Sequence, residues 1–149
     1  MKSRLVWEQA GERTFVVVLD AGDEAFAAIT DFANKNQLGG ASLSAIGAFE
    51  RATVGWFDRA AKQYRRIPVD QQCEVLSLIG DVAEGPDGPS LHAHVVLGLA
   101  DGTARGGHLL EGWVFPTLEV IVTEAPAQLR KVIRPDLGIA LIDLDRSES

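Results

Sequence analysis

The stretch SLHAHVVLGLADGTARGGHLLEGW, from Ser90 to Trp113, contains two strand-like runs separated by a short turn. The runs are LHAHVVLGL and ARGGHLL, and the ADG between them (Ala100–Gly102) is a hairpin turn signal. Short strands joined by tight turns favour antiparallel pairing. The stretch therefore predicts a β-hairpin within a mainly antiparallel sheet.

The same alternation of short apolar runs and turns extends over most of the chain. Further strands are predicted at FVVVLD, ASLSAIGAF, ATVGWF, QYRRIPV, CEVLSLIGDV, WVFPTLEVIVTE and GIALIDL. One segment, Asp23–Asn36, predicts a helix, because its apolar residues recur at three- and four-residue spacing (Phe26, Ile29 and Ala33). Asp20 is expected to cap this helix, and Gly39 and Gly40 are expected to end it. The pattern predicts an α+β fold: a mainly antiparallel β-sheet system with one principal helix packed on it.

Length and composition favour one soluble domain. The chain has 149 residues, of which 46% are hydrophobic and 23% charged, enough to bury a core without cross-links. No apolar run is long enough for a signal peptide or a membrane span. We expect a single domain over residues 1–149, with its core at about residues 15–144, in the cytoplasm. The lone Cys73 is expected to be a small buried core residue.

The charge balance argues against a nucleic-acid partner. The chain has 14 basic and 21 acidic residues, a net charge of −7, whereas non-specific binding to nucleic acid depends on Lys and Arg neutralising phosphates. The densest basic group is interpreted as the solvated side of a hairpin; it consists of Arg59, Lys62, Arg65 and Arg66.

All three histidines of the chain lie within the opening stretch, at His92, His94 and His108. The i, i+2 spacing of His92 and His94 places both imidazoles on one face of a strand, and His108 lies on the next strand. Three neutral imidazoles and an open position are typical of a catalytic zinc site, and imidazole also suits iron, nickel or copper. The alternative is three separately hydrogen-bonded histidines in a sheet.

The loop of the hairpin decides whether the three histidines share a face. With a two-residue loop at Asp101 and Gly102, His108 would face Val95 and point away from His94. A three-residue loop restores the shared face, and so does one residue bulged out at Gly106–Gly107. These glycines could also allow close backbone approach to a ligand or a neighbouring subunit.

Glu111 lies three residues after His108, in HLLEG. It could be a fourth metal ligand, a general base acting on metal-bound water, or a partner that orients an imidazole. It could equally be a surface carboxylate at a turn.

Four segments together resemble the prokaryotic branch of the PPC (plants and prokaryotes conserved) domain family: IGAFERATVGWFD, CEVLSLIGDVA, LHAHVVLGLADG and GGHLLEGWVFPTLEVIV. The resemblance runs from about Phe15 to Leu144. It implies an α+β fold, a homotrimer and a metal bound at the three histidines. The fold is also similar to that of acetolactate decarboxylase, a zinc enzyme with a three-histidine site. Plant relatives follow AT-hook DNA-binding motifs, whose Arg-Gly-Arg-Pro core this chain lacks.

Two functions follow as hypotheses. In the first, a trimer carries a divalent metal, zinc, at the three histidines and is a hydrolase or lyase for a small-molecule substrate. The metal then polarises a substrate oxygen or activates water, and Glu111 shuttles the proton. In the second, the chain is a DNA-associated or assembly module whose metal is structural or vestigial.

Overall fold

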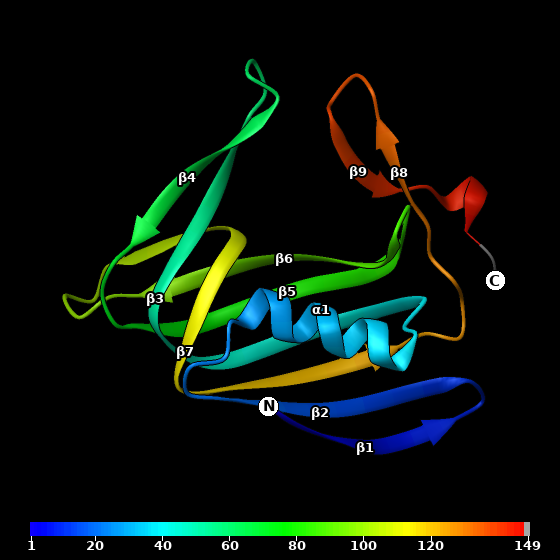
Figure 1. The fold of residues 1–149 in the computed structure, drawn as a ribbon, viewed down its shortest axis with the longest axis horizontal. Coiled ribbons are helices and arrows are strands. Elements are labelled where there is room, and N and C mark those ends of the chain that lie inside the picture. The colour runs from blue at the N-terminus through cyan, green and yellow to red at the C-terminus, as the bar shows by residue number, and fades with distance from the viewer. Residues whose placement is uncertain (148–149) are drawn as a thin grey trace.

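In the computed structural model, which describes residues 1–147, the chain folds into nine strands, one α-helix and one short 3-10 helix (Figure 1). The elements are β1 (Lys2–Gln9), β2 (Glu12–Asp20), α1 (Ala25–Asn36), β3 (Gly40–Asp58), β4 (Gln63–Val69), β5 (Cys73–Gly85), β6 (Gly88–Gly98), β7 (Ala104–Glu124), β8 (Lys131–Arg134), β9 (Ile139–Ile142) and a 3-10 helix at Leu144–Arg146.

Seven of these strands form one antiparallel sheet in the order β1-β2-β7-β6-β5-β3-β4, and β3 pairs with β7 as well. Strands β3, β5, β6 and β7 therefore pair in a closed ring. The two longest strands, β3 and β7, bend along their length, and each pairs with three other strands (Figure 1). Register shifts interrupt the pairing of β3 with β7. The remaining pair, β8 and β9, forms a separate hairpin after the sheet.

The single α-helix packs on the inner face of the sheet (Figure 1). Its buried side chains are Ala25, Ile29, Phe32 and Ala33, which join sheet residues such as Leu19, Phe49, Leu78 and Leu118 in the core. The predicted α+β class and the predicted apolar face of the helix are thus confirmed. Burial of these side chains removes apolar surface from water and holds the two layers together.

The helix ends differ from the prediction. Glu24 caps the start, since its carboxylate accepts hydrogen bonds from the backbone N–H groups of Phe26 and Ala27. Asp20 instead pairs with the N-terminal ammonium group. The helix ends at Asn36, and Gln37 adopts the left-handed conformation before either glycine is reached.

Several strand boundaries also differ. ASLSAIGAF and ATVGWF belong to the one strand β3, and ARGGHLL and WVFPTLEVIVTE belong to the one strand β7. In each case the alternation of apolar and polar residues is interrupted, and this interruption predicted two separate strands. In the structure the pairing continues past these points through β-bulges. Strand β1 was not predicted, and neither was β8. Every residue of β1 is exposed, so this strand has no buried alternation to reveal it.

Two smaller predictions are confirmed. Cys73 is 2% exposed, and burial raises the pKa of its thiol. The basic group lies on the β3–β4 hairpin, with all four of its side chains exposed. No helix in the described part of the chain is long and apolar enough to cross a membrane.

Candidate metal centre

The β6–β7 hairpin brings the three histidines to one face of the sheet. His94 is paired directly with His108, and Gly98 with Ala104. The pairing continues to Leu99, whose N–H donates to the carbonyl of Thr103 over 2.8 Å. The loop is therefore the three residues Ala100–Gly102, one of the two routes that the sequence left open. The ladder runs without a register shift through Gly106 and Gly107, so no bulge is needed there.

One ring nitrogen from each histidine lies within 4.8 Å of the corresponding nitrogens of the other two. The Nε2 atoms of His92 and His94 are 3.2 Å apart. Two nitrogens bound to a tetrahedral zinc at about 2.0–2.1 Å from the ion would be about 3.4 Å apart. The cluster could hold a metal after small rotations of the rings.

The imidazole of His108 lies between two other rings. Its centroid is 4.5 Å from that of Tyr64 and 5.1 Å from that of His92, and each pair is inclined by 28°. A Cβ atom at Gly55 would lie only 2.9 Å from Cδ1 of Tyr64, so this glycine makes room for the tyrosine ring over His108. Likewise, a Cβ at Gly107 would lie 2.6 Å from the carbonyl oxygen of Gly55. The glycines therefore serve close approach of β3, β4 and β7.

This packing keeps His108 neutral. Burial, followed by the nearby charges of His92, His94 and Lys131, lowers the pKa of His108 to about 4. Burial also lowers the pKa of His94, with a smaller contribution from His92. In addition, Nδ1 of His108 is buried and has no hydrogen-bond partner in residues 1–147. A neutral ring with a nitrogen that lacks a partner is the state in which histidine binds a cation.

Behind His92 lies a carboxylate that the sequence did not single out. Asp81 on β5 is paired with His92 in the sheet, and its Oδ2 is 3.3 Å from Nδ1 of His92. The other oxygen, Oδ1, is 2.7 Å from Nζ of Lys131 on β8. The β5–β6 register could have indicated Asp81, whereas nothing in the sequence pattern places Lys131 at the site.

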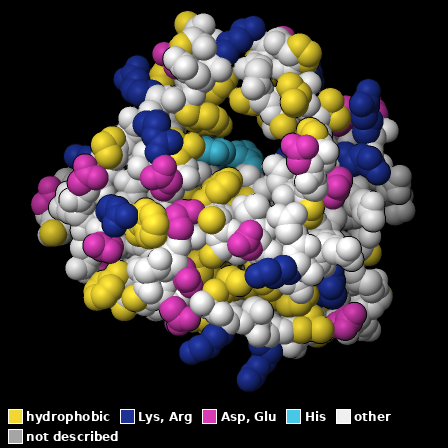
Figure 2. Space-filling model, viewed as in Figure 1, with side chains coloured by type: hydrophobic (Ala, Val, Ile, Leu, Met, Phe, Trp, Pro, Cys, Tyr) yellow, Lys and Arg dark blue, Asp and Glu magenta, His cyan; other side chains and the backbone are white. Residues whose placement is uncertain are grey.

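The cluster faces a hollow in the surface. Figure 2 shows the histidine side chains at the bottom of a depression between the β3–β4 and β8–β9 hairpins. A pocket of about 200 Å³ opens here beside two of the histidines, and its lining residues are Tyr64, Ser90, Leu91, His92, His108, Lys131, Ile139, Ala140 and Leu141. A second hollow lies on the other side of the cluster, next to Ile79, Asp81, His92 and His94. The site is therefore accessible from outside.

Glu111 lies near this site without joining the cluster. Thr53 pairs with Glu111 and Val54 with Leu109, so Leu110 is an extra residue in β7. This bulge places Glu111 on the same face of β7 as His108. Its carboxylate forms an ion pair with Arg66 of β4, and both side chains are about half exposed.

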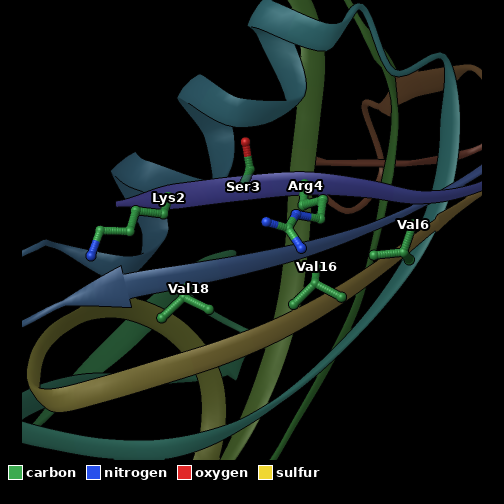
Figure 3. Close-up of a pocket in the computed structure, with 6 residues that line it drawn as sticks. All are labelled: Lys2, Ser3, Arg4, Val6, Val16 and Val18. Carbon is green, nitrogen blue, oxygen red and sulfur yellow. The ribbon is translucent and has the colours of Figure 1, made fainter.

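Another hollow is found outside β1 and β2, where the side chains labelled in Figure 3 form its wall. They are Lys2, Ser3, Arg4, Val6, Val16 and Val18. None of them is a histidine, a cysteine or a carboxylate. This hollow therefore lacks the side chains that usually bind a metal.

The closed antiparallel sheet, its helix and the histidine cluster define an α+β domain with a candidate metal site on a β-hairpin. The chain belongs to the Plants and Prokaryotes Conserved (PCC) domain family, whose sequence profile matches residues 7–126. A plant- and prokaryote-conserved protein from Pyrococcus horikoshii is 32% identical, with a TM-score of 0.83 over 88% of this chain and 91% of that chain.

Other similar structures carry two different descriptions. A protein from Archaeoglobus fulgidus is described as metal-containing; it is 31% identical, with a TM-score of 0.82 over 96% of this chain and 99% of that one. A protein from Ralstonia eutropha JMP134 is described as a candidate DNA-binding protein; it is 27% identical, with a TM-score of 0.81 over 87% and 90% of the two chains. The α-acetolactate decarboxylase of Bacillus subtilis strain 168 is 15% identical, with a TM-score of 0.53, over 85% of this chain and 58% of that chain, and shares the fold alone.

A curated relative is a much longer protein. The bifunctional protein GlmU of Synechococcus sp. (strain JA-3-3Ab) is 29% identical over 133 residues, which are 89% of this chain. The chain spans only 20% of the length of that relative.

Proposed function

We propose that this protein binds one divalent metal ion, zinc, at His92, His94 and His108, and that the ion serves chemistry on a small molecule. The observation that carries the proposal is the convergence of three ring nitrogens within 4.8 Å on one sheet face. Three imidazole ligands leave a fourth position open, which is typical of catalytic rather than structural zinc. The metal-containing relative from Archaeoglobus fulgidus adds support.

The pocket beside the cluster suggests the kind of substrate. Its volume of about 200 Å³ is smaller than that of pockets for drug-sized ligands, and much of its wall is apolar, from Leu91, Ile139, Ala140 and Leu141. We therefore propose a small substrate with a short apolar part and an oxygen that reaches the metal. A bound zinc would supply Lewis acidity to that oxygen, as expected of a metal-dependent hydrolase or lyase. Glu111, on the same face of β7 as His108, is the general base of this proposal.

A homotrimer is part of the same proposal. A row of paired residues runs over the outer face of the sheet from His94 through Ile79 and Ser44 to Ile121. The large apolar side chains on and around this row are strongly exposed: Ile46 by 62%, Leu76 by 56%, Ile79 by 60% and Ile121 by 42%. An apolar face of this kind favours contact with another copy of the chain. Such a contact would lie directly beside the metal site.

The DNA-associated alternative has weaker physical support. The net charge of −7 opposes contact with phosphates, and the four basic residues are divided between the loop of the β3–β4 hairpin and strand β4. Two of these residues are already engaged, since Arg66 pairs with Glu111 and Arg65 lies over the ring of Trp56. The metal-binding function therefore accounts for more of the observed arrangement.

Metal analysis of the purified protein tests the proposal. We expect about one zinc per chain in the wild type and close to none in His94→Ala, because two imidazoles hold zinc far more weakly than three. Arg105→Ala is the control: this exposed residue lies on β7, three positions before His108, and its loss should leave the metal content unchanged. A wild-type protein that contains no metal after zinc loading and desalting would refute the proposed function.

A further inference from the structure

Lys131 is a buried lysine placed directly behind the metal site. Its side chain is 3% exposed, although lysine is almost never buried unless its charge is paired. Its ammonium group lies 2.7 Å from Oδ1 of Asp81 and donates a hydrogen bond of 2.9 Å to the carbonyl oxygen of Ser90. Ser90 is two residues before His92 on the same strand. Lys131 therefore contacts both the strand that carries His92 and the carboxylate beside His92.

Asp81 divides its two oxygens between a cation and an imidazole. While Oδ1 faces Lys131, Oδ2 lies 3.3 Å from Nδ1 of His92. A carboxylate at Nδ1 favours the tautomer that has its proton on that nitrogen. Nε2 of His92 then carries a free lone pair, and this is the atom that lies 3.2 Å from Nε2 of His94. Asp81 is thus placed to favour Nε2 of His92 as the nitrogen offered to a cation.

Lys131 comes from a part of the chain outside the family match, which ends at residue 126. The segment leading into β8 is joined to the sheet by a hydrogen bond of 2.7 Å from the Glu84 N–H to the Leu129 carbonyl. The β8–β9 hairpin then forms one wall of the pocket beside the histidines through Ile139, Ala140 and Leu141. From this segment, Lys131 places its ammonium group beside Asp81, next to the metal site.

We propose that Lys131 and Asp81 form a positioning pair that fixes the His92 imidazole for the metal, and that the C-terminal hairpin thereby contributes to metal affinity. This inference rests on the metal binding proposed above. Coulomb's law alone predicts the opposite effect, because removing the positive charge of Lys131 should strengthen the binding of a cation nearby. The sign of the change in affinity therefore separates positioning from simple electrostatics.

The first experiment measures the zinc Kd by competition with a chelator for the wild type, Lys131→Met, Asp81→Asn and the double variant. We expect each single substitution to weaken zinc binding by about 10- to 100-fold, the range typical of partners that orient metal ligands. In the Asp81→Asn background, Lys131→Met should have little further effect, because Lys131 acts through Asp81. Arg134→Met is the matched control. It removes one positive charge from the same strand, but Arg134 is exposed and pairs with Asp136, so its zinc Kd should equal that of the wild type.

The outcomes separate the two proposals. A wild type that does not bind zinc refutes the proposed function and this inference together. Wild-type binding that is unchanged or tightened in Lys131→Met refutes the positioning pair alone, as does full additivity in the double variant. Circular dichroism and light scattering show whether each variant keeps its fold and assembly.

A second measurement needs no variant of Lys131 or Asp81 to fold. In the metal-free wild type, nitrogen-15 correlation spectra should show His92 as the tautomer protonated on Nδ1, with the signal assigned by its loss in His92→Gln. A His92 ring protonated on Nε2 instead would overturn the inference.

Discussion

Acidification should destabilise the metal-free protein, because His108 would have to accept a proton inside its stack. The ring lies between Tyr64 and His92, and burial there lowers its pKa from the ordinary 6.5 to about 4. Between these two values the unfolded chain binds a proton at this position and the folded chain does not. Folding stability from this group is therefore constant above about pH 6.5 and falls as the pH decreases towards about 4.

The size of the effect follows from the shift and from the exposure of the ring. A difference of one pKa unit corresponds to about 1.36 kcal/mol, so the full shift sets an upper bound of about 3.4 kcal/mol. His108 is only partly buried, and solvent around the exposed part of the ring reduces the effect. We expect a loss of about 1–2 kcal/mol from His108 between pH 6.5 and pH 4.

Urea unfolding of chelator-treated protein measures this loss at a series of pH values and one fixed protein concentration. His108→Gln is the comparison, because it removes the titrating group and keeps a polar side chain of related size. Its stability should fall less steeply than that of the wild type over this pH range. The acidic groups with lowered pKa, Asp23 and Asp101, titrate below their ordinary value of 3.8 and contribute little in this window. Equal pH dependence in the two proteins would show that the stack does not hold His108 neutral.

Light scattering of the wild type should give a mass about three times the 16.0 kDa of one chain. Ile79→Lys should shift this mass towards that of the monomer, because it places a charge on the apolar outer face. A monomeric wild type would contradict the proposed trimer. Glu111→Gln should retain the wild-type zinc content, since the Glu111 carboxylate pairs with Arg66 and lies outside the histidine cluster; loss of zinc would instead identify Glu111 as a ligand. Fluorescence anisotropy with random duplex DNA at about 150 mM salt should show no sub-micromolar binding, because the chain has a net charge of −7. Tight binding that persists at that salt concentration would favour the DNA-associated alternative.

Local features of the sequence were enough to predict the hairpin, the helix and the three metal-binding candidates. His92 and His94 share a strand, and alternation along that strand places them on one face whatever the rest of the fold does. The helical spacing of Phe26, Ile29 and Ala33 likewise depends only on residues close in the chain. The clustering of the histidines and the helix are confirmed, and the cause of the shared face of His92 and His94 and of the helix lies within a few residues. Metal binding at the histidines stays a prediction.

The composition of the site depended on contacts between segments that are far apart in the chain. The ADG turn allowed two loop lengths, and a slip of one residue would have turned His108 to the opposite face. Only the pairing of His94 with His108 in the folded sheet selected the three-residue loop. Sheet register is a property of two strands together, so one strand's sequence cannot set it alone.

The tertiary structure likewise determines which residues surround the histidine cluster. Tyr64 reaches His108 because β4 pairs with β3, and Gly55 leaves space for its ring. Asp81 on β5 and Lys131 on β8 meet at His92, although the two residues lie far apart in the chain. The burial of Lys131 depends on this meeting, because its charge is tolerated there only beside the carboxylate. The sequence by itself determined which side chains could bind a metal, and the tertiary structure decided which neighbours orient them and keep them neutral.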